Sequence, residues 1–251
     1  MLKRRIIPTL LLQNGRMIKT VNFAAFRDVG DPITAARVYN DMRADELIFL
    51  DITASTEARE ALSTVITQVA EECFMPLAVG GGIRTVEDIR RTISSGADKV
   101  IINTAALENP DFIDMAVARF GSSTIVVSID VRYNDQHEPI VFSHRGSQDT
   151  GRSAIAWAQE VTNRGAGEIM ITSIEHEGTM KGLDFDLTAT IIESVNVPVI
   201  AHGGVGSLAD FKKAYDLGAM AVAAGSIFHF TDQSPIMTRN YLYNNGVVVR
   251  P

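Results

Sequence analysis

Length, composition and charge narrow the kinds of protein that this chain can be. It has 251 residues, of which 46% are hydrophobic and 21% are charged, as in ordinary globular domains. The 30 acidic residues outnumber the 23 basic residues, and the net charge of −7 argues against nucleic acid or an anionic membrane surface as a partner. The only cysteine, Cys73, excludes an internal disulfide framework and a multi-thiolate metal site.

Hydrophobic segments give a first indication of the compartment. No apolar run reaches the roughly 18 residues of a membrane-spanning helix. The first eight residues are basic and then apolar, but no small-residue cleavage site of a secretory signal follows them. We therefore expect a cytoplasmic protein. We also expect that it uses neither a metal ion nor a cofactor.

Eight short apolar runs alternate with amphipathic segments along the chain. The runs are almost continuously apolar, which is typical of parallel strands that are buried on both faces. An open doubly wound sheet is the alternative, but residues 10–15 lack the Gly-x-Gly-x-x-Gly pattern that it usually carries after its first strand. Eight strand–helix units in this length predict an α/β fold, a single TIM barrel of the (β/α)₈ type over residues 1–251. The predicted strands are Ile6–Leu12, Leu47–Asp51, Leu77–Gly80, Val100–Ile102, Ile125–Asp130, Ile169–Thr172, Val199–Ala201 and Ala221–Ala224.

The second half of the chain repeats the first. Residues 75–104 align without a gap to residues 197–226, and the identical pairs are Pro76/Pro198, Gly81/Gly203, Gly82/Gly204, Asp88/Asp210, Gly96/Gly218, Ala97/Ala219 and Val100/Val222. This pattern predicts two duplicated half-barrels, at about residues 1–123 and 124–251. A duplicated half-barrel carries its binding features twice, on opposite sides of the barrel mouth.

Glycines and hydroxyl residues follow matching strands in the two halves. Glycines at these places let the backbone approach an anion, and a following helix directs N–H groups at it. The alternative is that the glycines only form tight turns, but the repetition favours a pair of phosphate sites. The residues concerned are Gly82, Asn103 and Thr104 in the first half, and Gly203, Gly204, Gly225 and Ser226 in the second. We expect a phosphorylated small molecule with two phosphate-like ends.

Several segments together resemble a known family, the cyclase subunit of imidazole glycerol phosphate synthase. The similar segments are residues 45–55, 79–83, 96–100, 102–106, 165–169 and 227–230, and the resemblance covers essentially the whole chain. It implies a barrel that takes ammonia from a glutaminase partner. At the top of the barrel, the family adds this ammonia to a bis-phosphorylated ribotide.

The family uses two aspartates, and this chain retains one of them. Asp130 matches the second aspartate, but Leu11 stands at the first position. General acid–base catalysis is worth about 10²–10⁴-fold, and leucine has no proton to give. The rate of cyclisation should therefore be strongly reduced, unless Asp51, Glu175 or Glu177 takes the role of the missing aspartate. The alternative for Asp130 is a purely structural role as a cap of its loop.

At other positions of the family pattern, this chain has either the family's residue or a different one. The resemblance makes Lys19 a mobile-loop lysine that reaches a substrate phosphate. His202 and Arg145 stand where the family usually has small polar residues, so we expect the two sites to differ in ligand from those of the family. The full set of phosphate- or substrate-binding positions that we expect is Lys19, Asp51, Gly82, Asn103, Thr104, Thr172, Gly203, Gly204, Gly225 and Ser226.

Four charged residues stand at the starts of strands: Arg5, Glu46, Lys99 and Glu168. Two positive and two negative charges can neutralise one another at the bottom of a barrel. The resemblance makes them a gate for ammonia, with Asp98 at the docking face of the glutaminase. The alternative is a set of ordinary stabilising ion pairs.

These observations favour the barrel subunit of a glutamine-dependent amidotransferase, paired with a glutaminase in a heterodimer. Residues 8–12 resemble a related branch that is associated with amidation of nucleotide sugars in bacterial surface-polysaccharide pathways. There the two subunits supply ammonia to a third, ATP-dependent enzyme. The alternatives are an authentic histidine-pathway cyclase, the related sugar isomerase, and a non-catalytic conduit or scaffold for the glutaminase.

Overall fold

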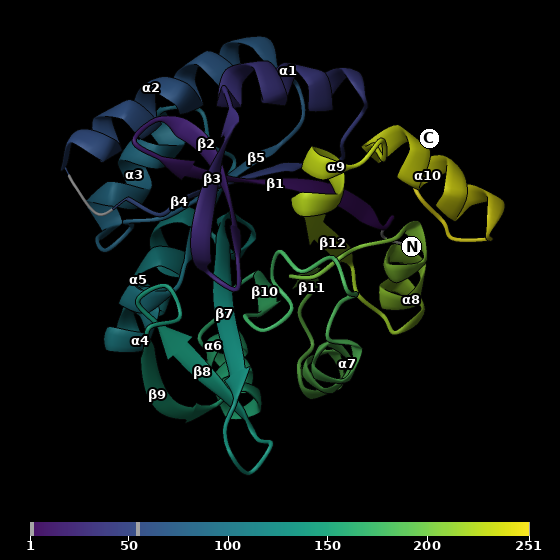
Figure 1. Cartoon of the computed structure of the whole chain (residues 1–251). Coiled ribbons are helices and arrows are strands. Elements are labelled where there is room, and N and C mark those ends of the chain that lie inside the picture. Colours follow the sequence, from purple (N-terminus) through teal and green to yellow (C-terminus); the bar gives the residue numbers. More distant parts are fainter. Residues whose placement is uncertain (1–2, 54–55, 251) are drawn as a thin grey trace.

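A closed barrel of eight parallel strands forms the centre of the computed structural model, which describes residues 3–53 and 56–250 (Figure 1). Each strand pairs in parallel with its neighbours, and the pairs β1–β12 and β7–β10 close the circle. This confirms the predicted (β/α)₈ fold. The barrel strands are β1 (Arg5–Gln13), β4 (Leu47–Asp51), β5 (Leu77–Gly80), β6 (Lys99–Ile102), β7 (Ile125–Tyr133), β10 (Glu168–Ser173), β11 (Val199–His202) and β12 (Ala221–Ala224).

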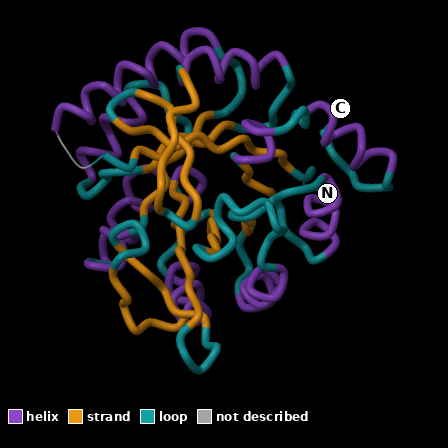
Figure 2. Tube along the Cα trace, viewed as in Figure 1, coloured by secondary structure: helices purple, strands orange, loops and turns teal. Residues whose placement is uncertain are grey.

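Helices cover the outside of the barrel (Figure 2). Three clusters of buried apolar side chains fill the space between the strands and these helices. No helix of the described chain is both long and apolar enough to cross a membrane. The helices are α1 (Pro32–Asp41), α2 (Thr56–Glu72), α3 (Val86–Ser94), α4 (Thr104–Glu108), α5 (Asp111–Phe120), α6 (Ala154–Asn163), α7 (Phe185–Ser194), α8 (Leu208–Asp216), α9 (Ser226–Phe230) and α10 (Pro235–Asn244), with a 3₁₀ turn at Ser122–Thr124.

Two antiparallel excursions extend the first strand of each half. β2 (Arg16–Val21) and β3 (Ala24–Gly30) continue from β1, whereas β8 (Pro139–Ser143) and β9 (Gln148–Ser153) continue from β7. The sequence analysis did not predict these four strands. It also ended the β7 strand too early, because it continues to Tyr133 to pair with β8.

The repeated sequence positions have the same local hydrogen bonds in both halves. Before α3, the Asp88 carboxylate accepts from the backbone N–H groups of Arg84 and Thr85 at 3.1 and 3.0 Å. Before α8, Asp210 accepts from the N–H groups of residues 206 and 207, both at 2.9 Å. Each carboxylate thus fixes the turn that leads from a glycine pair into a helix.

Alternate residues of the barrel strands point inward, and they form three layers. The charged residues identified above occupy the bottom layer, at the strand starts. The middle layer is apolar and consists of Ile7, Ile48, Ala78, Ile101, Val126, Met170, Ile200, Ala221 and Ala223. The top layer is mostly polar and contains Thr9, Asn103, Ser128, Asp130, Thr172 and His202, with Leu11 and Leu50. The fold therefore places polar side chains at the two ends of an apolar interior.

Candidate functional site

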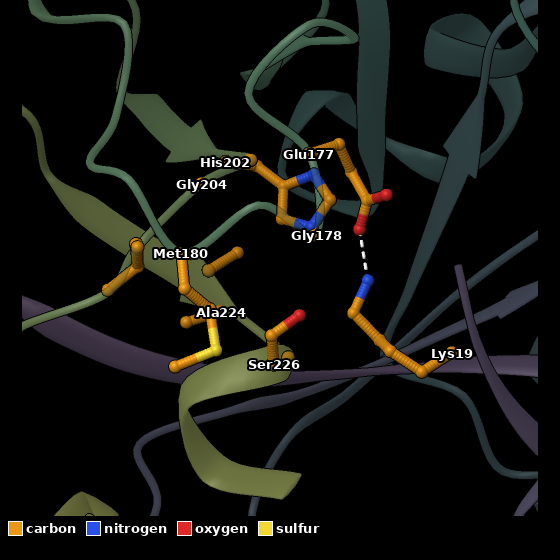
Figure 3. Close-up of a pocket in the computed structure, with 12 residues that line it drawn as sticks. Lys19, Glu177, Gly178, Met180, His202, Gly204, Ala224 and Ser226 are labelled. Atoms are coloured by element: carbon orange, nitrogen blue, oxygen red, sulfur yellow. Dashed lines mark hydrogen bonds and ion pairs between the residues drawn. The ribbon is translucent and has the colours of Figure 1, made fainter. Parts of the chain in front are cut away.

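A pocket lies at the carboxyl ends of β11 and β12, in the second half of the barrel (Figure 3). Gly203 and Gly204 adopt positive φ angles of 94° and 104°, a region of backbone geometry that favours glycine. The hydroxyl of Ser226 is buried and has no hydrogen-bond partner in the described chain. The lining residues are Lys19, Glu177, Gly178, Met180, His202, Gly203, Gly204, Val205, Ala223, Ala224, Gly225 and Ser226. All four second-half residues of the predicted phosphate site, together with Lys19, therefore lie around one pocket. We call it the second-half pocket.

Lys19 is not where the sequence analysis expected it. It lies within β2 rather than in a loop, and only 5% of its surface is exposed. Its Nζ forms an ion pair with Glu177, and the hydroxyl of Thr20 donates to the same carboxylate at 3.2 Å. The prediction of a loop lysine was wrong because β2 pairs with both β1 and β3. The ammonium group that lines the pocket is thus already paired with a carboxylate.

The first-half cradle contains Gly82, Asn103 and Thr104. Each of its two polar side chains makes one hydrogen bond within the protein, whereas Asn103 Oδ1 is buried without a partner in the described chain. The amide of Asn103 donates to Asp130 Oδ2 at 2.8 Å, and the Thr104 hydroxyl accepts from the backbone N–H of His144 at 3.0 Å. The turn between β8 and β9 thus lies against this cradle. Gly82 has a φ of 64° and faces open space.

Asp130 is buried in the top layer of the barrel, where Asn103 and Ser128 both donate to its carboxylate. Burial raises its pKa from 3.8 to about 7, and the nearby Glu177 charge adds to this rise. The hydrogen bonds from Ser128, Asn103 and Thr172 oppose it. A carboxyl group with a pKa near neutrality can both give and take a proton, which suits an acid–base role.

His202 occupies the wall of the second-half pocket. Its Nδ1 lies 3.0 Å from the hydroxyl of Thr172, and the residue is only 8% exposed. Burial, together with the charge of Lys19, lowers the pKa of the imidazole from 6.5 to about 3. The ring is therefore neutral at physiological pH.

The direct strand neighbours of Leu11 are apolar and supply no carboxylate in its place. Leu11 pairs with Leu50 of β4 and with Ile18 of β2, and it is partly exposed. Asp51 is buried, which raises its pKa, and its Oδ1 accepts from the backbone N–H of Thr53 at 2.7 Å. Asp51 therefore shapes the loop after β4.

The two other candidate substitutes are placed differently. Glu175 is exposed, and Glu177 is paired with Lys19. Arg145, the other residue that departs from the family pattern, is exposed and donates to the carbonyl of Ile52 at 2.9 Å.

Four charged side chains form a closed ring at the bottom of the barrel, which we call the charge ring. Arg5 pairs with Glu46 at 2.6 Å and also with Glu168. Lys99 pairs with the same two carboxylates, at 3.1 Å to Glu46 and 2.7 Å to Glu168. Burial opposes the charge on Arg5, but the carboxylates outweigh it and raise the pKa of the guanidinium. The structure thus brings together all four residues that the sequence analysis grouped.

The same face of the barrel carries two exposed residues. Asp98 directly precedes Lys99, and its Oδ2 accepts from the backbone N–H of Leu77 at 2.8 Å. Phe74, in the connection that leads into β5, is 94% exposed. Aromatic residues are enriched in protein interfaces, so an exposed phenylalanine on this face is notable. The structure shows no cluster of metal-ligating side chains within residues 3–53 and 56–250.

Among the residues of these sites that sequence reasoning missed are Thr20, Ser128 and Met180. Ser128 had a signal, since it lies two residues before Asp130 in a strand and so faces the same side. Thr20 and Met180 had none, because their places depend on how distant loops meet.

The comparison with known families agrees with this architecture. The model of one family, described as histidine biosynthesis protein, matches residues 5–234. The chain belongs to this family. The match covers all eight barrel strands, and with them the charge ring and the second-half pocket.

Proposed function

We propose that this chain is the barrel subunit of a glutamine-dependent amidotransferase. It receives ammonia from a separate glutaminase subunit at the face that carries the charge ring, and it passes the ammonia through the barrel interior. The two subunits form a heterodimer, with Asp98 and Phe74 at the docking face. The proposal rests on the family resemblance, with the closed charge ring as its main structural support.

One atom of the charge ring supports a role beyond stability. Glu46 is 2% exposed, and its Oε1 is buried without a hydrogen-bond donor in the described chain. A buried carboxylate oxygen without a donor is costly, so a purely structural ring would be expected to satisfy it. Ammonia or ammonium carries N–H groups that fit this oxygen.

The barrel interior above the ring suits a neutral molecule. Its middle layer is apolar, so an ammonium ion would lose its hydration there while ammonia loses much less. At the upper end, the hydroxyl of Thr9 is buried and has no partner in the described chain. A passing ammonia molecule thus meets a polar atom at each end of an apolar path.

Leu11 argues against the family's own reaction as the end point of the ammonia. Without a second acid at the top of the barrel, the family's cyclisation lacks a proton carrier. We therefore infer that the ammonia leaves for a nucleotide sugar on a third, ATP-dependent enzyme in the cytoplasm. The resemblance of residues 8–12 to that branch supports this choice.

Two other functions compete with this proposal: a histidine-pathway cyclase and a conduit without a catalytic role. Asp130 favours an authentic cyclase, since its carboxyl titrates near neutral pH. A conduit without any ligand at its mouth is the other alternative. An assay of the purified chain with ammonium salts and the histidine-pathway ribotide separates them, because only a cyclase forms the imidazole product.

The experiment that tests the proposal removes one member of the charge ring. Lys99→Ala leaves the two carboxylates without one of their cations, and this opens or distorts the ring. We expect the ratio of glutamine-driven to ammonia-driven product formation to fall about tenfold or more, since free ammonia enters by other routes. The ratio is measured with the glutaminase present, and Lys212→Ala on the outer helix α8 is the matched control. If both rates fall equally, Lys99 stabilises the fold and does not gate.

A further inference from the structure

His202 presents one ring nitrogen to the second-half pocket without a partner. Its Nδ1 is bonded to the Thr172 hydroxyl, whereas its Nε2 has no hydrogen bond to any described residue. Figure 3 shows the ring directed into the pocket, toward the ion pair of Lys19 and Glu177. The Nε2 atom is thus available to form a hydrogen bond with a ligand in the pocket.

Thr172 connects His202 to Asp130. Thr172 and Asp130 are direct neighbours in the pairing of β10 with β7, so their side chains lie on the same inner face of the barrel. The Thr172 hydroxyl is one of the groups whose hydrogen bonding lowers the pKa of the Asp130 carboxyl. The same hydroxyl bonds to His202 Nδ1. A hydroxyl has only one proton, so it donates to one of these neighbours and accepts from the other.

We propose that Asp130, Thr172 and His202 form a hydrogen-bond relay, in which the proton on Asp130 sets the tautomer of His202 and thereby the group that the second-half pocket offers to an oxyanion. His202 is then a specificity-determining residue of the pocket, and Thr172 is the positioning residue that links it to Asp130.

The two states of the relay differ by one bound proton. When Asp130 is ionised, it can only accept, so Thr172 donates to it and accepts from Nδ1–H of His202. The Nε2 atom is then bare and repels an oxyanion. When Asp130 is protonated, it donates to Thr172, which donates to a bare Nδ1. The ring proton is then on Nε2, where it can donate to an oxyanion. The imidazole is neutral in both states.

The surroundings of both groups fit these states. Asp130 is faced by the side chains of Asn103, Ser128 and Thr172 and by the charge of Glu177. His202 is faced by Thr172 and by the charge of Lys19. The elevated pKa of Asp130 brings its titration near neutral pH, and the lowered pKa of His202 keeps the ring uncharged there.

The relay couples the two halves of the barrel. Asp130 is bonded to Asn103 of the first-half cradle, whereas His202 lines the pocket of the second half. By linkage, an oxyanion that binds at His202 takes up a proton at Asp130. The identity of this ligand rests on the proposed phosphate-like substrate, but the relay itself does not.

The first experiment observes the tautomer directly, without any ligand. The full chain is labelled with ¹⁵N at its histidines, and His202→Asn assigns the ring signals of residue 202. We expect the Nε2–H form at pH 5.5 and the Nδ1–H form at pH 8.5. Thr172→Val should abolish this switch, whereas Thr172→Ser, which keeps the hydroxyl, should retain it. Asp130→Asn should hold the Nε2–H form throughout, because its amide donates at every pH.

Two results would overturn the relay: a wild-type tautomer that is the same at both ends of this range, or a switch that persists in Thr172→Val. These results do not depend on whether the chain binds phosphate or transfers ammonia. Circular dichroism of each variant checks that it is folded. If Thr172→Val does not fold, the Thr172→Ser variant and the wild type still test the relay.

The second experiment uses sulfate, which does not itself titrate in this range. We expect its affinity for the wild type to fall about tenfold between pH 5.5 and 8.5, since one hydrogen bond to a charged group is lost. In Thr172→Val this fall should be much smaller. A tautomer switch without any sulfate binding would refute the oxyanion ligand alone, and a pH-dependent affinity in Thr172→Val would refute the role of the relay in binding.

Discussion

The two half-barrels build the same cradle from the backbone and use it differently. Each has a glycine pair with positive φ angles after one strand and, after the next strand, a short helix that begins at a hydroxyl residue, Thr104 or Ser226. In the first half, the Thr104 hydroxyl accepts a hydrogen bond from the turn between β8 and β9. In the second half, the Ser226 hydroxyl has no partner in the described chain and faces a pocket.

This difference separates what the two halves share from what they do not. Turns, glycines and helix caps depend on local sequence, and both halves have them. The groups that fill the cradles come from elsewhere in the chain, such as His144 for one and Lys19 for the other. In the first cradle the turn between β8 and β9 lies against Thr104, whereas the second cradle opens to a pocket, so we expect the second to be the stronger site for a phosphate group.

The largest effect is expected where the first strands of the two halves differ, at Leu11 of β1 and Asp130 of β7. Wild-type turnover of the histidine-pathway ribotide with ammonium salts should be absent, or lower by at least about 10²-fold than that of a two-aspartate enzyme. Leu11→Asp supplies a second titrating group at the barrel mouth and should raise this turnover. The measurement is the rate at which the imidazole product forms.

Leu11→Asn is the matched control, since it is similar in size to aspartate but has no proton to transfer at neutral pH. A rate increase in both variants would point to shape rather than acid–base chemistry. Robust cyclase activity of the wild type would contradict the prediction and favour the authentic cyclase.

The next effect is a pair of opposite pH dependences. Asp130 has a higher pKa in the folded chain, about 7, than in the unfolded chain, so its contribution to stability is complete below about pH 4 and is lost as the pH rises to 7. His202 has a lower folded pKa, about 3, so its contribution is present above pH 6.5 and is lost as the pH falls. The two contributions oppose each other in the wild type.

Single variants should separate them. On acidification from pH 6.5 to 4.5, the free energy of unfolding of Asp130→Asn should fall relative to the wild type, whereas that of His202→Asn should rise. Each difference approaches at most about 1.4 kcal/mol per pH unit. Urea denaturation at several pH values measures both, and curves that run parallel to the wild type would contradict the prediction.

The smallest effect compares the two hydroxyls at equivalent positions. Ser226→Ala removes a donor that we expect to bond to a phosphate oxygen, and phosphate affinity should fall about tenfold. Thr104→Ala is the matched variant of the first half, and it should change this affinity less than twofold, because Thr104 does not line the second-half pocket, where we expect the phosphate to bind. Isothermal titration with inorganic phosphate measures both. Equal losses would show that the two cradles bind alike.

Much of the barrel could be predicted from the sequence, because strands buried on both faces read as continuous apolar runs. The ranges Leu47–Asp51, Leu77–Gly80 and Ala221–Ala224 were correct to the residue. The excursion of β2 and β3 gave no such signal, since it contains charged residues that are typical of loops. Arg16 and Asp28 pair across these strands at 3.0 Å, so charge there stabilises a hairpin.

The site was predictable where local sequence determines it. The glycine pairs and the four residues of the charge ring could be identified from repetition and resemblance. The pairing of Lys19 with Glu177 could not, because 158 residues separate them and only the folded barrel brings β2 against the loop after β10. The contact between Thr104 and the turn from β8 to β9 was missed for the same reason, because distant segments form it.

The two ends of the described chain lie close together, and this makes the barrel suitable for circular permutation. Arg4 forms a bridge with Val249 and donates to the carbonyls of Gly218 and Ala219, so residues from both ends of the described chain lie side by side. The junction between the half-barrels, at Gly121 and Ser122, is exposed. A circular permutant that joins the old ends and opens at this junction keeps every strand pair of the barrel. In such a chain the second half would be synthesised first, yet the same residues would meet to close the same barrel.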